Sequence, residues 1–164
     1  MRPFEITQFL DMLYDRCHDV FSQQEDTLAL FNTFQKTRDN YILAPLPDHP
    51  GLFYRYRVQR NSTSIELYIA TGDQDANHRL FEQLRNHAED INRALDAELD
   101  WRDLKDNDEP MGIRRIVWLF EGKGGYANDP DEWLNIQAPL PDAIVKFDHV
   151  MREWLRDIQK PSSV

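Results

Sequence analysis

The stretch LFYRYRVQRNSTSIELYI, residues 52–69, decides the fold. Apolar and polar side chains alternate through residues 52–59 and again through 64–69, which is the period-two pattern of half-buried strands. An antiparallel hairpin that turns at Arg60 and Asn61 pairs positions whose numbers sum to 121. A slip of one residue would mix apolar and charged side chains on each face. The stretch therefore predicts a hairpin with one core face and one outer face.

This register places Tyr54, Tyr56, Ile65 and Leu67 on the core face. The outer face collects aromatic and charged side chains: Phe53, Arg55, Arg57, Glu66 and Tyr68. Three interpretations of the outer face are open. Tyrosine and arginine are enriched in protein interfaces, and aromatics interleaved with arginines can also bind single-stranded nucleic acid. Alternatively, another helix covers the face, and Arg55 and Glu66 form an ordinary cross-strand pair.

The rest of the chain reads as helices and strands around this hairpin. A helical N-terminal segment covers 4–38, and a second helix starts within it near the capping-box pair Ser22 and Glu25. A loop with three prolines (45–51) precedes the hairpin, and a central helix (74–95) follows it. The chain continues with two strands (99–104, and 113–120 placed centrally in the sheet), a loop (121–138) and a C-terminal helix that has Pro141 in its first turn. We predict an α+β fold in which an antiparallel sheet of about four strands packs against the N-terminal helical segment, the central helix and the C-terminal helix. We expect a single domain, 1–164, with an α+β body over 41–160.

Composition narrows the function classes. The 29 acidic residues outnumber the 19 basic ones and give a formal charge of −10, which argues against direct nucleic-acid binding by this chain without a partner. No apolar run is long enough to span a membrane, and the first residues lack a signal core. A single cysteine, Cys17, falls on an apolar helical stripe, so we expect a buried thiol. We expect a cytoplasmic protein.

Few residues suggest catalysis. Restriction-type nucleases combine an acidic residue with an acid-x-Lys pair at a strand end, where the carboxylates hold Mg²⁺. The chain has two such pairs, Asp103 with Lys105 and Glu121 with Lys123, and Asp100 could complete a site. With 29 acids and five lysines, about one pair is expected by chance. The histidines lack the spacing of a metal site. We therefore predict no catalytic residues, no metal and no cofactor.

Several segments are similar to a known family. Ile65 to Ile69, Gly72-Asp73, Leu99 to Trp101, Asp131 to Trp133 and the last helix resemble the prokaryotic domain-of-unknown-function family 4268, over roughly residues 50–155. Members of that family often stand at the C-terminal end of larger bacterial and archaeal proteins whose other part looks nuclease-like. The resemblance implies an association with DNA processing or with defence against foreign DNA, and it supplies no catalytic residues.

Two function classes follow. The first is a non-catalytic interaction or accessory module in a prokaryotic DNA-processing or anti-phage defence system, which works as a homodimer or with another protein partner. The outer face of the hairpin is its candidate interface, and a two-fold dimer would bury Phe53 and Tyr68 on both copies. The alternative is a small metal-dependent, nuclease-like enzyme that uses Glu121, Lys123 and either Asp100 or Asp103.

Overall fold

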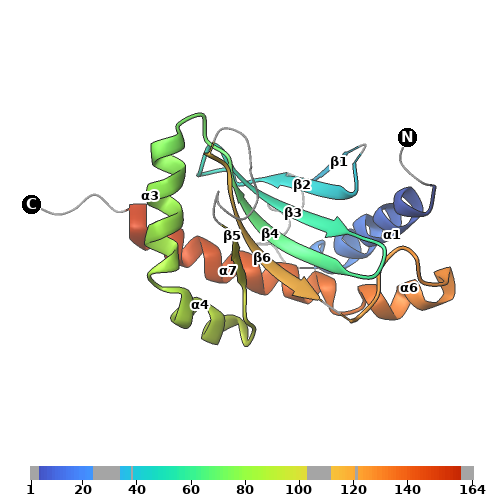
Figure 1. Ribbon diagram of the computed structural model, residues 1–164. Helices are drawn as coiled ribbons and strands as arrows, with labels where there is room; N and C mark the ends of the chain where they lie inside the picture. Colours follow the sequence, from blue (N-terminus) through green and yellow to red (C-terminus); the bar gives the residue numbers. More distant parts are fainter. Residues whose placement is uncertain (1–3, 24–33, 38, 103–111, 121, 160–164) are drawn as a thin grey trace, which may run out of the picture.

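The fold is built on one antiparallel sheet of six strands. The computed structural model describes residues 4–23, 34–37, 39–102, 112–120 and 122–159 (Figure 1). The strands lie in the order β1-β2-β3-β4-β6-β5, and every neighbouring pair is antiparallel. Their bounds are β1 (Gln35–Lys36), β2 (Tyr41–Pro45), β3 (Leu52–Val58), β4 (Thr63–Ile69), β5 (Asp100–Arg102) and β6 (Arg114–Phe120).

The hairpin predicted from the sequence is confirmed residue by residue. Strands β3 and β4 pair Tyr54 with Leu67, Tyr56 with Ile65 and Arg55 with Glu66, so paired numbers sum to 121. The four residues expected on the core face are buried, with at most 2% of each exposed. Both the register and the assignment of the two faces therefore follow from the alternation of side chains.

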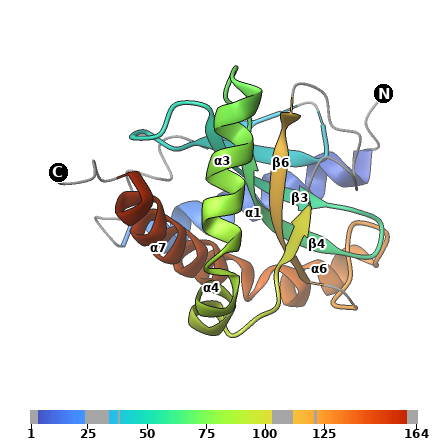
Figure 2. The same cartoon turned by 60° about the vertical axis from the view of Figure 1, so that its left-hand side comes forward.

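The helices of the described chain pack on the core face. They are α1 (Phe4–Phe21), α3 (Gln74–Arg85), α4 (Ala88–Leu95), α6 (Pro130–Gln137) and α7 (Leu140–Gln159). Phe147 of α7 packs edge-on against Tyr54 of β3, and Phe81 of α3 packs against Trp101 of β5. Figures 1 and 2 show α1 and α7 on the same side of the sheet. The α+β class is thus confirmed, and the apolar core lies between the sheet and these helices.

The N-terminal prediction is partly wrong. Helix α1 buries Phe9, Leu13 and Cys17, as its periodicity indicated, but it ends at Phe21. The second predicted helix falls largely on residues 24–33, outside the described residues. Its expected end is instead strand β1, which pairs with β2 through Gln35 and Leu43. The sheet has six strands where the sequence suggested about four, and the two that it missed are β1 and β2. Both are short, and the two residues of β1 leave no readable period.

Two further elements differ from the sequence prediction. The central helix divides into α3 and α4 at Asn86 and His87, and the His87 ring stacks on Trp154 of α7 at 4.5 Å between centroids. This break lets α4 turn and pack against α7, which a straight helix of 22 residues, about 33 Å long, could not do along its whole length. The expected loop 121–138 contains α6, which begins at Pro130 and buries Trp133.

Strand β6 lies beside β4 on one side and β5 on the other, as its two apolar faces indicated. It is second from the edge of the sheet and not at the centre. The loop after β6 returns to the hairpin turn, where Tyr126 donates its N–H to the carbonyl of Gln59. A Cβ at Gly125 would stand 2.0 Å from that carbonyl oxygen, so only glycine fits this close approach.

Within the described ranges, every helix is too short or too polar to traverse a lipid bilayer.

Candidate functional site

The outer face of the sheet gathers all five residues that the sequence placed there. Strands β3 and β4 contribute Phe53, Arg55, Arg57, Glu66 and Tyr68 in one register. The helix–sheet ring contacts described above involve core-face residues, and no helix of the described chain lies over the outer face in Figures 1 and 2. Phe53 and Tyr68 face each other across the hairpin with ring centroids 6.5 Å apart. The predicted patch therefore exists as one continuous surface.

Glu66 is the centre of this surface and is fully buried. Its Oε1 lies 2.5 Å from Nε of Arg55, the residue directly across the strand pair. Its Oε2 accepts hydrogen bonds from Arg115 of β6, at 2.8 Å from Nη2 and 3.3 Å from Nε. Arg57 approaches the same oxygen to 3.8 Å. One carboxylate thus faces three guanidinium groups, which we call the Glu66 cluster: Arg55, Arg57, Glu66 and Arg115.

The register of the sheet explains why these groups meet. Arg55 is opposite Glu66 on β3, and Arg57 and Arg115 are its diagonal neighbours on the two flanking strands. Such diagonal positions lie about 7–8 Å apart, within reach of long side chains. An unpaired carboxylate in a buried position would be costly, and the surrounding arginines make its ionised form tolerable.

Arg55 is held between two aromatic rings. Its guanidinium carbon lies 4.6 Å from the centroid of Tyr41 on β2 and 4.4 Å from that of Tyr68 on β4. This cation–π sandwich fixes the side chain over Glu66 and leaves it only 14% exposed. It also means that the two tyrosine faces that could stack a base already carry a guanidinium.

Arg57 is the least compensated member of the Glu66 cluster. The contact of 3.8 Å to Glu66 is too long for a hydrogen bond, and its Nε has no hydrogen-bond partner. Burial lowers the pKa of Arg57 from its ordinary value, the Glu66 carboxylate opposes that shift, and the neighbouring arginines add to it. The side chain is 18% exposed, so its charge is accessible from outside.

Two residues of the alternative, nuclease-like site, Asp100 and Lys123, fall within the described residues. Asp103 and Glu121 lie outside the described residues. Asp100 stands opposite Val117 in the sheet and pairs with Arg102 at 2.7 Å. Lys123 follows the far end of β6 and lines a cavity of about 270 Å³ with Asn128 and Glu132. The two described candidates therefore belong to different parts of the sheet.

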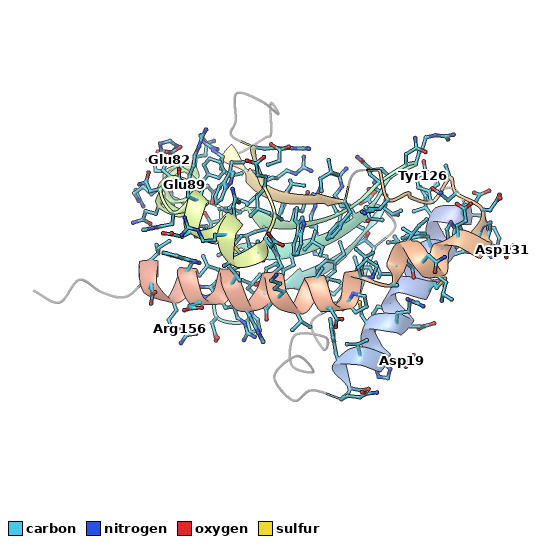
Figure 3. All side chains as sticks on the ribbon, turned by 90° about the horizontal axis from the view of Figure 1, so that it is seen from below. Asp19, Glu82, Glu89, Tyr126, Asp131 and Arg156 are labelled. Atoms are coloured by element: carbon cyan, nitrogen blue, oxygen red, sulfur yellow. The ribbon has the colours of Figure 1, made fainter. Side chains whose placement is uncertain are left out.

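Across the described ranges, no group of three or more histidine, cysteine, aspartate or glutamate side chains could hold a metal ion. His78 and His87, expected on one helix, are separated by the break between α3 and α4. Figure 3 shows Glu82 of α3 and Glu89 of α4 on one side of the molecule and Asp131 of α6 on the opposite side.

A second polar cluster lies in the core and has a structural role. Tyr54 donates its hydroxyl hydrogen to Asp148 of α7 at 2.7 Å, and Arg152 contacts the other oxygen of Asp148 at 2.6 Å. Burial, with the negative charge of Asp148 beside it, raises the pKa of Tyr54 well above its ordinary value. These contacts satisfy buried polar atoms and join β3 to α7.

The family model described as Domain of unknown function (DUF4268) matches residues 14–155. The chain belongs to this family. The match confirms the resemblance seen in the sequence and extends it to α1, beyond the residues that first suggested it. No curated protein and no solved structure shows significant similarity to the chain.

In this DUF4268 member, sequence reasoning missed two residues of the outer face. Arg115 lies in the strand predicted at 113–120, which the sequence did not pair with the hairpin, and Tyr41 lies outside every predicted strand. The alternation of β6 could have found the first, because Ile116 faces inward and its neighbours must face outward. The second needed β2, whose five residues carry no strong periodic signal.

Proposed function

We propose that this protein is a non-catalytic interaction module that binds a protein partner through the outer face of its sheet. The observation that carries the proposal is the Glu66 cluster with its aromatic border, held on the face that no helix of the described chain covers. Arginine and tyrosine dominate the energetic centres of protein interfaces. Because the sheet already fixes these side chains, binding would immobilise few of them anew.

The setting that we propose is a prokaryotic DNA-processing or anti-phage defence system. The support is the resemblance of the sequence to a family whose members often accompany nuclease-like parts. In such a setting, the nuclease-like part performs the chemistry, and this module supplies a contact between proteins. The charge of −10 supports this division, because a broadly acidic surface repels a phosphate backbone.

Site-specific crosslinking tests this function. The photoreactive residue p-benzoylphenylalanine replaces Phe53, a close match in shape, in the full chain expressed in its native cells. The matched control places the same residue at Leu134 of α6, which is 52% exposed. We expect a discrete crosslinked protein from position 53 and none from position 134. Absence of a product at position 53, or the same products from both positions, would contradict the proposal.

The partner could also be a second copy of the chain, as the sequence predicted, and this remains a prediction. The charge of −10 on each copy opposes association, so a homodimer would tighten as salt screens the repulsion. Light scattering at micromolar protein and at low and physiological salt decides this point. A dimer mass that rises with salt supports the homodimer, and a monomer mass at both salts assigns the interface to a different protein.

A further inference from the structure

We propose that Arg57 is a recognition point for a carboxylate on an acidic segment of a different protein. The inference deepens the proposed function and rests on it: the outer face binds a protein, and Arg57 defines which chemistry that protein presents. The partner segment carries aspartate or glutamate side chains, one of which forms the close ion pair with Arg57 that no described residue of this chain provides.

The first argument is the distribution of contacts around Glu66. Arg55 lies 2.5 Å from Oε1 and Arg115 2.8 Å from Oε2, so both oxygens already have short contacts. Arg57 reaches Oε2 only at 3.8 Å. Glu66 is therefore committed to the other two arginines, and it cannot turn toward Arg57 without losing a short ion pair. A further carboxylate is the group that would complete the charge pattern.

The second argument is the position of Arg57 in the sheet. It lies on the outer face of β3, opposite Tyr41 on β2 and Ser64 on β4. Neither neighbour carries an acidic side chain that could neutralise it. Its Nε is buried without a hydrogen-bond partner, and 18% of the side chain as a whole is exposed, so a group that approaches from outside meets the exposed part of the side chain and not Nε. Arginine offers its donors in a planar fork that matches a carboxylate.

The choice of occupant follows from charge and from the aromatic rings. Single-stranded nucleic acid binds such sheets by stacking bases on exposed rings. Here the guanidinium of Arg55 lies over both Tyr41 and Tyr68, so stacking would first have to displace it. A two-fold dimer whose axis passes near Arg57 would bring the two copies of this arginine together, where like charges repel. An acidic segment of another protein meets neither of these two obstacles, and the three arginines of the Glu66 cluster, only one of whose charges Glu66 balances, attract it locally against the overall charge of −10.

Fluorescence anisotropy with a fluorescein-labelled hexaglutamate peptide tests the inference on the full chain. We expect saturable binding that weakens as salt is added. Arg57→Gln should weaken it about tenfold, the range of one charge-assisted contact, while Arg57→Lys, which keeps the charge but loses the planar fork, should weaken it less than Arg57→Gln. The matched control is Arg60→Gln, which removes an exposed arginine from the turn of the same hairpin and should leave the affinity unchanged.

A second variant keeps the test decisive if Arg57→Gln fails to fold. Ser64→Asp leaves every arginine in place and adds a carboxylate directly across the strand pair from Arg57. This internal carboxylate should occupy Arg57 and reduce peptide binding about tenfold without loss of thermal stability. Unchanged peptide affinity in a folded Arg57→Gln or Ser64→Asp protein overturns the inference, as does the absence of any peptide binding.

A labelled dodecathymidine oligonucleotide tests the main alternative, which is that the outer face binds single-stranded nucleic acid. Tighter binding of this oligonucleotide than of the peptide, with loss in Arg57→Gln, would overturn the inference in favour of a nucleic-acid surface. The proposed function is tested independently by the crosslinks at position 53. If these crosslinks persist while the peptide does not bind, the face is still a protein interface, and only its preference for acidic segments is wrong.

Discussion

Replacing Leu67 with alanine tests the assignment of the two sheet faces. Leu67 lies on β4 between Tyr54 of β3 and Ile116 of β6, and none of its surface is exposed. The substitution removes three carbon atoms from the core. At about 0.8 kcal/mol for each buried carbon group, the transfer term is about 2.4 kcal/mol. The cavity left behind adds to this cost, so we expect a loss of about 3–4 kcal/mol.

The matched control is Leu119→Ala on β6. Leu119 has the same side chain in a paired strand, opposite Ser64 on the outer face, but it is 36% exposed. Part of its transfer free energy is never gained on folding, and the gap left by alanine opens to water. We expect a loss of about 1–1.5 kcal/mol. The two variants therefore differ mainly in which face of the sheet they occupy.

Urea unfolding followed by far-ultraviolet circular dichroism measures both losses, and equal m-values ensure that the free energies are comparable. A loss of less than about 1 kcal/mol for Leu67→Ala would refute the packing argument, because even the transfer term alone exceeds it. A loss no larger than that of Leu119→Ala would equally refute the assignment of faces.

Three further predictions concern charge, pH and catalysis. Glu66→Gln should cost about 3 kcal/mol in urea unfolding, because it leaves three arginines around a neutral group, whereas Glu82→Gln in an exposed pair with Arg85 should cost under about 0.5 kcal/mol. Burial raises the pKa of the Cys17 thiol to about 12, against 9.0 for an ordinary thiol. The unfolded chain therefore ionises first, and the contribution of Cys17 to stability is complete below about pH 9 and is lost as pH rises toward 12. Unfolding by urea at pH 8 and pH 10 should show this loss, Cys17→Ala should reduce it, and a thiol reagent should label the native protein at pH 8 no faster than global opening allows. Finally, the purified chain should not cleave DNA or RNA with Mg²⁺ or Mn²⁺, and cleavage that Glu121→Gln abolishes would show that the nuclease alternative is right.

The hairpin shows how much the sequence alone could predict. Its two strands are adjacent in the chain, and each has an apolar side that must leave water. Only one register buries both sides together, so pairing, facing and the outer-face residues could all be predicted. The long stripes of α1 and α7 are similarly clear, because 18 and 20 residues give several repeats of the helical period.

Periodicity in the sequence could not reveal the short helices and strands. Strand β1 has two residues and α6 has eight, so neither spans enough repeats to reveal its period. The break between α3 and α4 has no proline or glycine to announce it, since the residues there are Asn86 and His87. It depends on packing: Ile91 of α4 is buried, and His87 stacks on Trp154 of α7, 67 residues further along the chain.

The candidate site also has residues that the sequence predicted and residues that it did not. Alternation along two adjacent strands is a local property, so it was enough to predict that one face holds Phe53, Arg55, Arg57, Glu66 and Tyr68. That Arg115 and Tyr41 join them became visible only in the folded chain, because β6 reaches β4 through a long connection and the five residues of β2 show no period that would set a register with β3. The tertiary structure also decided how the charges are shared. Glu66 has two carboxylate oxygens, both committed to Arg55 and Arg115, and this leaves Arg57 with a distant contact. Side-chain distances between strands follow from packing in three dimensions, and a one-dimensional pattern does not contain them.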